Sequence, residues 1–140
     1  MEDFFTEIAG AFLYGVVGII LLVVGFLVID LLTPGKLGDL IIHERNRSAG
    51  IVAAAGLIAV GTIVTTAIAS ADGSLGEGLA ETAGYGGVGV LMLGLAFFVI
   101  DLFTPGKLGD FVVGEGEQPA AWMTGAALLA VGAIVAAAIS

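Results

Sequence analysis

The stretch VIDLLTPGKLGD (residues 28–39) recurs almost unchanged as VIDLFTPGKLGD (residues 99–110). The two copies are 71 residues apart, and the same spacing aligns Tyr14 and Gly15 with Tyr85 and Gly86. Self-similarity at one fixed spacing is typical of a duplicated structural unit. We therefore predict two tandem repeats, residues 1–71 and 72–140. In each repeat the duplicated stretch follows one long apolar run and precedes another.

These apolar runs are long enough to cross a membrane. The chain is 59% hydrophobic and 12% charged, whereas soluble domains usually carry about 25% charged residues. About 20 apolar residues span the hydrocarbon core as a helix, and the runs are continuous, without the alternation of a barrel strand. We predict an all-α integral membrane protein with four transmembrane helices, at about residues 8–32, 48–70, 82–103 and 119–139.

Each repeat is then a helical hairpin whose two helices are joined by residues 33–47 or 104–118. Because each hairpin crosses the membrane twice, the two repeats are parallel, and we expect a two-fold axis along the membrane normal to relate them. All four basic residues lie in these two loops, and the positive-inside rule places such loops in the cytoplasm. Both termini are then outside. The basic residues are Lys36, Arg45, Arg47 and Lys107.

Small residues are concentrated in the second and fourth apolar runs. Helices associate in lipid through close packing of small side chains, because lipid tails are as apolar as leucine. We therefore predict a homo-oligomer held together by these faces, with Gly56 and Gly132 as contact residues. Packing of the same faces within one chain is the alternative.

The duplicated loop contains a proline that must end or kink the helix before it. In the first repeat this is Pro34, and Thr33 could cap a new short helix that has proline at its first position. Leu37, Leu40 and Ile41 share one face of that helix, which predicts an amphipathic segment lying in the membrane interface in each repeat. The loop positions singled out are Thr33, Pro34, Gly35 and Asp39, with Thr104, Pro105, Gly106 and Asp110 as their equivalents.

Asp30 and Asp101 each follow a long apolar run, and ionisable residues within membrane spans are costly and often functional. Asp30 lies about ten residues beyond the centre of its run, about 15 Å from the midplane and at the edge of the hydrocarbon. A carboxylate near a helix C-terminus also opposes the helix dipole. We therefore predict a structural ion pair or loop anchor with Lys36 or Lys107, and we keep an ion or proton pathway as the alternative.

Other chemistry has little support in the sequence. The chain has no cysteine and one histidine, so we predict no metal site, no catalytic residues, no cofactor and no enzymatic activity. A net charge of −9 argues against nucleic-acid binding, which needs a basic surface.

The Thr-Pro-Gly-Lys-Leu loop, followed by Glu-Arg-Asn-Arg-Ser-Ala-Gly at residues 44–50, resembles the YjfL-like bacterial inner-membrane proteins, a family of unknown function (DUF 350). The resemblance covers nearly the whole chain. It implies a multi-pass protein of the bacterial cytoplasmic membrane. Some members look to be encoded near envelope-stress proteins of the phage-shock type and near ATP-grasp ligases, which implies a membrane anchor or scaffold for cytoplasmic partners. In the second repeat, residues 115–119 depart from this pattern.

Two functions follow from these observations. The first is a non-enzymatic, oligomeric scaffold in the lipid bilayer that docks cytoplasmic proteins, with Arg45 and Arg47 as candidate docking residues. The second is an ion- or proton-conducting channel or small transporter that uses Asp30 and Asp101.

Overall fold

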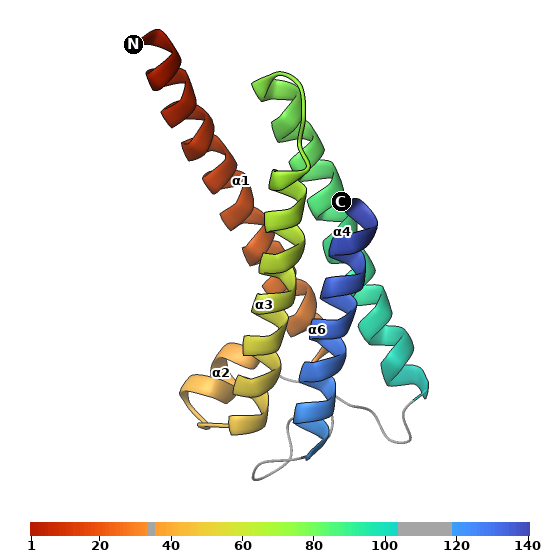
Figure 1. Cartoon of the computed structure of the whole chain (residues 1–140). Coiled ribbons are helices and arrows are strands. Elements are labelled where there is room, and N and C mark those ends of the chain that lie inside the picture. The colour runs from red at the N-terminus through yellow and green to blue at the C-terminus, as the bar shows by residue number, and fades with distance from the viewer. Residues whose placement is uncertain (34–35, 104–118) are drawn as a thin grey trace.

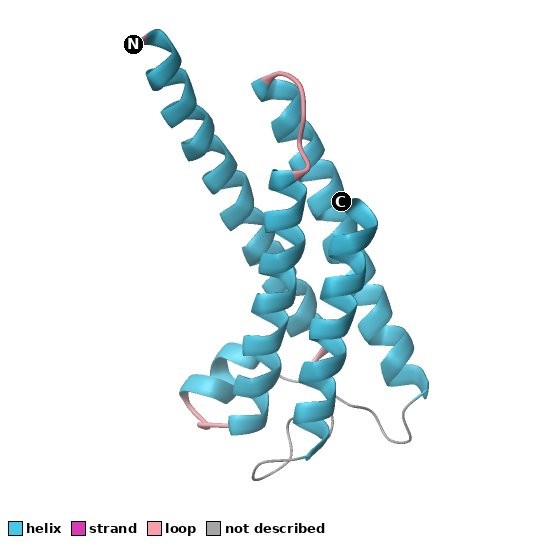
Figure 2. Cartoon of the chain, viewed as in Figure 1, coloured by secondary structure: helices cyan, strands magenta, loops and turns pink. Residues whose placement is uncertain are grey.

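The computed structural model describes residues 1–33, 36–103 and 119–140, and this part of the chain contains helices and no strands. The elements are α1 (Glu2–Leu32), α2 (Leu37–Ile42), α3 (Arg47–Ala69), α4 (Leu75–Phe103) and α6 (Pro119–Ile139) (Figures 1 and 2). All but α2 are long and apolar enough to cross a membrane. The predicted all-α membrane protein with four transmembrane helices is confirmed.

α1 and α4 begin earlier than the apolar runs. α1 has Glu2 and Asp3 in its first turn, where negative charge interacts favourably with the helix dipole. At the start of α4, Glu77 accepts hydrogen bonds from the Ser74 backbone at 2.9 Å and the Ser74 hydroxyl at 3.0 Å, and its own N–H donates to that hydroxyl at 3.4 Å. This reciprocal capping box adds polar turns that hydropathy alone does not detect.

The two hairpins stack side by side. α1 packs on α4, and α3 makes its most extensive contact with α6, so equivalent helices of the two repeats are neighbours (Figure 1). α3 also packs on α4, whereas α1 and α6 make at most marginal contact. A two-fold axis would require an α1–α6 contact equal to the α3–α4 contact. The predicted two-fold relation is therefore wrong: an even number of crossings fixes the direction of the second hairpin, but not the side on which it packs.

Glycines set the spacing between the helices. A Cβ atom added to Gly132 would lie 2.7 Å from the Cβ and 2.9 Å from the Cα of Ala59, so the α3 and α6 backbones nearly touch there. Gly56 faces the side chain of Ile29 on α1 in the same way. The two glycines predicted to mediate self-association are thus used inside the chain. Any contact between copies must use other surfaces.

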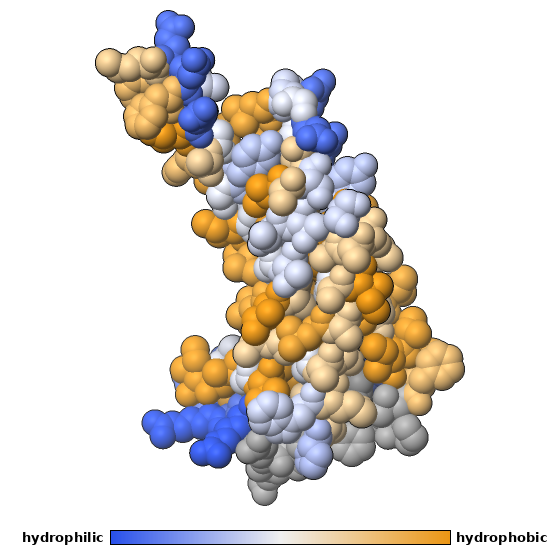
Figure 3. All heavy atoms as spheres, in the orientation of Figure 1, coloured by the Kyte–Doolittle hydropathy of each residue, from blue (hydrophilic) through white to orange (hydrophobic). Residues whose placement is uncertain are grey.

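The outer surface matches a protein in lipid. Hydrophilic residues gather at the two ends of the molecule, and apolar residues cover much of the surface between them (Figure 3). The N-terminal end of α1 leans away from the other helices (Figure 1), and residues 1–9 of the chain are all exposed. Large apolar side chains such as Phe12 and Leu91 are about two-thirds exposed on α1 and α4, at 70% and 67%.

We expect Gly132→Ala to destabilise the fold, because the added methyl group meets the backbone of Ala59. Overpacking of this kind costs about 1–3 kcal/mol, measurable as a lower midpoint of thermal unfolding in mild detergent. Gly84→Ala is the matched control, since no atom lies within 4 Å of a Cβ at that position. Equal midpoints for the two variants would contradict the close approach of α3 and α6.

Candidate functional site

The corner formed by α1, α2 and α3 contains most of the described residues that the sequence singled out. Asp30 lies half-buried in the last turns of α1. One of its carboxylate oxygens accepts the backbone N–H of Leu37, the first residue of α2, at 2.6 Å. A carboxylate stabilises the first turn of a helix, where N–H groups lack partners inside the helix. Asp30 is therefore a loop anchor that holds α2 to the end of α1.

Thr33 does not cap the helix that follows it. Its hydroxyl donates to the carbonyl of Ile29 at 3.0 Å, and its backbone N–H also bonds to carbonyls of α1. Thr33 is buried and ends α1, while α2 begins four residues later with Lys36 in the N-cap position. The predicted cap by Thr33 is wrong because α2 begins at Leu37, with Lys36 in the N-cap position and no side-chain cap.

α2 is fixed against α3 by packing and by hydrogen bonds. Leu37 is fully buried, Leu40 is nearly so, and α2 contacts α3 directly. The backbone N–H of Asn46 donates to the carbonyl of Leu40 at 2.8 Å, and the Asn46 side chain accepts the N–H of Ala49 at 3.0 Å, which caps α3. In the connection between α2 and α3, Arg45 has a left-handed backbone conformation with a φ of 53°. The predicted amphipathic loop helix is therefore present in the first repeat.

The charged groups of this corner face outward. Lys36, Asp39, Arg45 and Arg47 are all exposed. Among the residues that the structure describes, the one ion pair joins Asp39 to His43 at 4.0 Å, and exposed pairs of this kind stabilise little. Asp30 and Lys36 do not pair. The hydrogen bond that the structure gives the Asp30 carboxylate comes from the backbone N–H of Leu37, and the predicted pair with Lys107 lies outside the described residues.

The second corner lies mostly outside the described residues. Asp101 is half-buried in the last turns of α4, at the position equivalent to Asp30. The predicted partner Lys107, the second loop helix, and the remaining loop positions are outside the described part of the chain. Those positions are Pro34, Gly35, Thr104, Pro105, Gly106 and Asp110.

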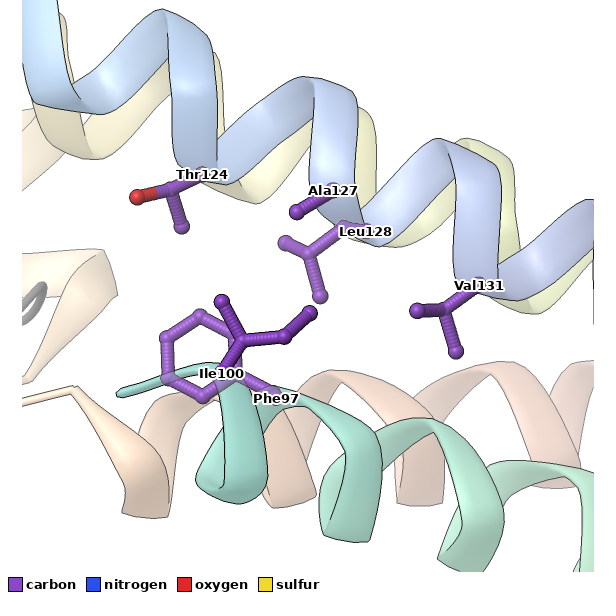
Figure 4. Close-up of a pocket in the computed structure, with 6 residues that line it drawn as sticks. All are labelled: Phe97, Ile100, Thr124, Ala127, Leu128 and Val131. Atoms are coloured by element: carbon purple, nitrogen blue, oxygen red, sulfur yellow. The ribbon is translucent and has the colours of Figure 1, made fainter. Parts of the chain in front are cut away.

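The described interior of the helix bundle is apolar. Its buried polar residues are Thr33, Ser48, Thr82 and Thr124, and it buries no charged side chain. The hollow between α4 and α6 is lined by Phe97, Leu128 and other apolar residues and has no room for a water molecule (Figure 4). The Thr124 hydroxyl on its rim donates to the carbonyl of Ala120 at 2.8 Å. No cluster of metal-ligating side chains occurs in the described ranges.

Two hydrogen-bonding residues of the corner and one buried residue of α4 were not predicted. The sequence drew attention to Asp30, but it did not identify the Leu37 amide as its partner, since seven residues separate them across a bend. Asn46 directly before an apolar helix is a recognisable cap signal. Thr82 is fully buried in α4, and its hydroxyl has no hydrogen-bond partner in the described structure. Nothing in its sequence context marks it.

Comparisons with known proteins cover nearly the whole chain. A family model described as Domain of Unknown Function (DUF350) matches residues 3–139. A UPF0719 transmembrane protein of Mycolicibacterium paratuberculosis is 42% identical over 128 residues, which cover 91% of this chain and 85% of the relative. UPF0719 transmembrane proteins of Mycobacterium bovis and Mycobacterium tuberculosis are each 35% identical over 128 residues, which cover 91% of this chain and 84% of each relative. No solved structure matches the chain significantly.

We expect Asp30→Ala to destabilise the corner by about 1 kcal/mol, the usual cost of losing a helix cap. Hydrogen exchange at the Leu37 amide should become faster, because that N–H loses its acceptor. Lys36→Gln is the control and should leave this exchange unchanged, since Lys36 does not pair with Asp30 in the structure. If Lys36→Gln accelerated exchange as much as Asp30→Ala, the ion-pair interpretation would be restored.

Proposed function

We propose that this chain, which belongs to the DUF350 family as the resemblance in its sequence implied, is a non-enzymatic membrane scaffold that recruits cytoplasmic proteins. The observation that carries this proposal is the fixed corner of α1, α2 and α3. Asp30, Leu37 and Asn46 hold its backbone, while Arg45 and Arg47 remain exposed. A rigid polar surface binds a partner at a lower entropic cost than a mobile loop.

The apolar interior gives less support to the alternative, conduction through Asp30 and Asp101. An ion crossing a bilayer needs charged or polar groups along its path. The described part of the bundle offers a few threonine and serine hydroxyls, and those of Thr33 and Thr124 already donate to carbonyls of their own helices. Asp30 is likewise engaged at one end of the bundle by the Leu37 amide.

The proposed orientation places α2 in the cytoplasm and both termini outside the bacterial cytoplasmic membrane. Lys36, Arg45 and Arg47 lie at the α2 end of the bundle. Glu2 and Asp3 lie at the other end, as do the polar residues of the α3–α4 connection. The positive-inside rule relates this asymmetry to topology.

We expect single cysteines at Gly38 and Ser74 to label from opposite sides of the membrane. The chain has no native cysteine, so each variant carries one reactive thiol. In intact cells an impermeant maleimide should modify Ser74→Cys, whereas Gly38→Cys should react only after the cells are opened. Labelling of Gly38→Cys in intact cells would contradict the orientation.

A photoreactive amino acid at Arg45 tests the recruitment of a partner. We expect it to form an adduct with a cytoplasmic protein in living cells, and Arg47→Glu in the same chain should reduce that adduct several-fold by reversing a neighbouring charge. The same amino acid at Ser74, on the other side, is the control and should capture no cytoplasmic protein.

The channel alternative has its own readout. Purified protein in liposomes should show no proton or cation flux above empty liposomes. The scaffold proposal fails if position 45 captures nothing while flux is present and is abolished by combining Asp30→Asn with Asp101→Asn.

A further inference from the structure

The contact between the two hairpins has two unlike sides. The second hairpin presents glycines, and the first hairpin presents side chains that pack onto them. At one such contact, a Cβ added to Gly86 would lie 2.6 Å from Cδ1 of Leu21. The glycine face of the second hairpin is Gly86, Gly89, Gly125 and Gly132, and the side-chain face of the first hairpin is, in the same order, Leu21, Ile63, Ala55 and Ala59.

Because the chain is a tandem repeat, the first hairpin carries its own copy of the glycine face. The equivalent residues are Gly15, Gly18, Ala54 and Gly61. In this copy no described residue of the second hairpin covers the face: no atom lies within 4 Å of a Cβ added to Gly15 or Gly61, and a Cβ added to Gly18 would meet only Val64 and Ile68 of its own hairpin. A groove of about 190 Å³ runs between α1 and α3 there, lined by all three glycines of the face together with Val64.

The equivalent of this groove in the second hairpin is filled. Gly86, Gly89 and Gly132 are buried under residues of the first hairpin, whereas their equivalents Gly15, Gly18 and Gly61 are not buried. The same pattern of residues thus exists twice in the chain, once covered by protein and once uncovered.

The second hairpin also carries a copy of the side-chain face, and this copy is uncovered as well. The residues equivalent to Leu21, Ile63, Ala55 and Ala59 are Met92, Ile134, Ala126 and Ala130. All four are exposed, Met92 at 45% and Ile134 at 68%. The chain therefore has an open glycine face on one flank and an open side-chain face on the other.

We propose that these two faces bind each other in neighbouring copies of the chain, so that the protein assembles head to tail in the membrane. The second hairpin of one copy stacks on the first hairpin of the next, which continues the stacking already present inside each chain. Met92 then packs on Gly15, and Ala130 on Gly61. Such a heterologous contact forms a ring where the rotation between copies closes, and an open row where it does not.

A second copy fits this surface better than a lipid chain does. Close contact of small residues with matching side chains drives helix association in lipid, and each open face is the repeat equivalent of a face already packed against the other kind. The fit is closest around Gly15 and Gly61. The glycine faces of the two repeats differ at one further position. Inside the chain Gly94 accommodates the side chain of Val28, whereas its equivalent in the first repeat is Val23. The inference does not depend on the proposed function.

Cysteine cross-linking between differently tagged chains tests the proposal. Inside the chain, a Cβ on Gly125 lies 3.3 Å from that of Ala55, close to the 3.5–4.5 Å of a disulfide. The equivalent pair between copies is Ala54 with Ala126. When Ala54→Cys and Ala126→Cys chains are co-expressed and their membranes are oxidised, we expect a dimer containing one chain of each kind. The combination Ala55→Cys with Gly125→Cys in one chain is the positive control for an internal bond.

Neither single-cysteine variant should cross-link to itself, because the two faces are unlike. Self-linked dimers of either variant would instead indicate a two-fold interface and overturn the proposal. An absence of mixed dimers while the internal control closes would overturn it as well.

Bulky substitution in the open groove gives an independent readout. We expect Gly61→Leu to reduce the mass seen by light scattering in mild detergent to that of one chain, with helix content unchanged, because the groove has room for leucine but not for leucine and a neighbour. Gly84→Leu is the control, since position 84 is equally open and its repeat equivalent is Leu13. A wild-type mass for Gly61→Leu would count against the proposal.

Discussion

Close contact at glycine is the constraint on which the arrangement of this protein depends. In lipid the helices gain little by hiding apolar surface from their surroundings, so van der Waals contact between them must hold the bundle together. Gly132 against Ala59 and Gly86 against Leu21 bring neighbouring helices within such contact. Side-by-side stacking of the hairpins follows, because the buried glycines of α4 and α6 receive side chains of the first hairpin.

The corner of α1, α2 and α3 meets a second constraint, because a chain that leaves a helix must still satisfy the hydrogen bonds of its backbone. Asp30 does this for the first residue of α2, and Asn46 does it for the first turn of α3. The Asp30 carboxylate lies near the C-terminus of α1, where the helix dipole disfavours negative charge, but it also contacts the N-terminus of α2, where the dipole favours it. The Leu37 amide thus gives the Asp30 carboxylate a structural partner at the end of α1.

The sequence predicted the number of membrane helices, their class and the short helix of the first loop, because length, hydropathy and a twelve-residue repeat are local signals. It did not predict the partner of Asp30, because lysine and a backbone amide are both within reach and only the path of the chain decides between them. The sequence also led to a wrong prediction for Gly56 and Gly132, which pack on Ile29 and Ala59 of the same chain and not on a second copy. A small residue reveals that something packs closely on it, but whether the neighbour belongs to the same chain depends on how the hairpins stack.

The four long helices differ in length, and this makes the protein uneven in height. α1 and α4 have 31 and 29 residues, whereas α3 and α6 have 23 and 21. At 1.5 Å per residue, the first pair exceeds the second by about 12 Å. Most of this extra length lies in the polar first turns of α1 and α4, which precede their apolar runs. At the end of the molecule that carries the N-terminus, α1 and α4 therefore extend past α3 and α6 (Figure 1), so the acidic first turns of the two longer helices lie beyond the apolar part of the bundle.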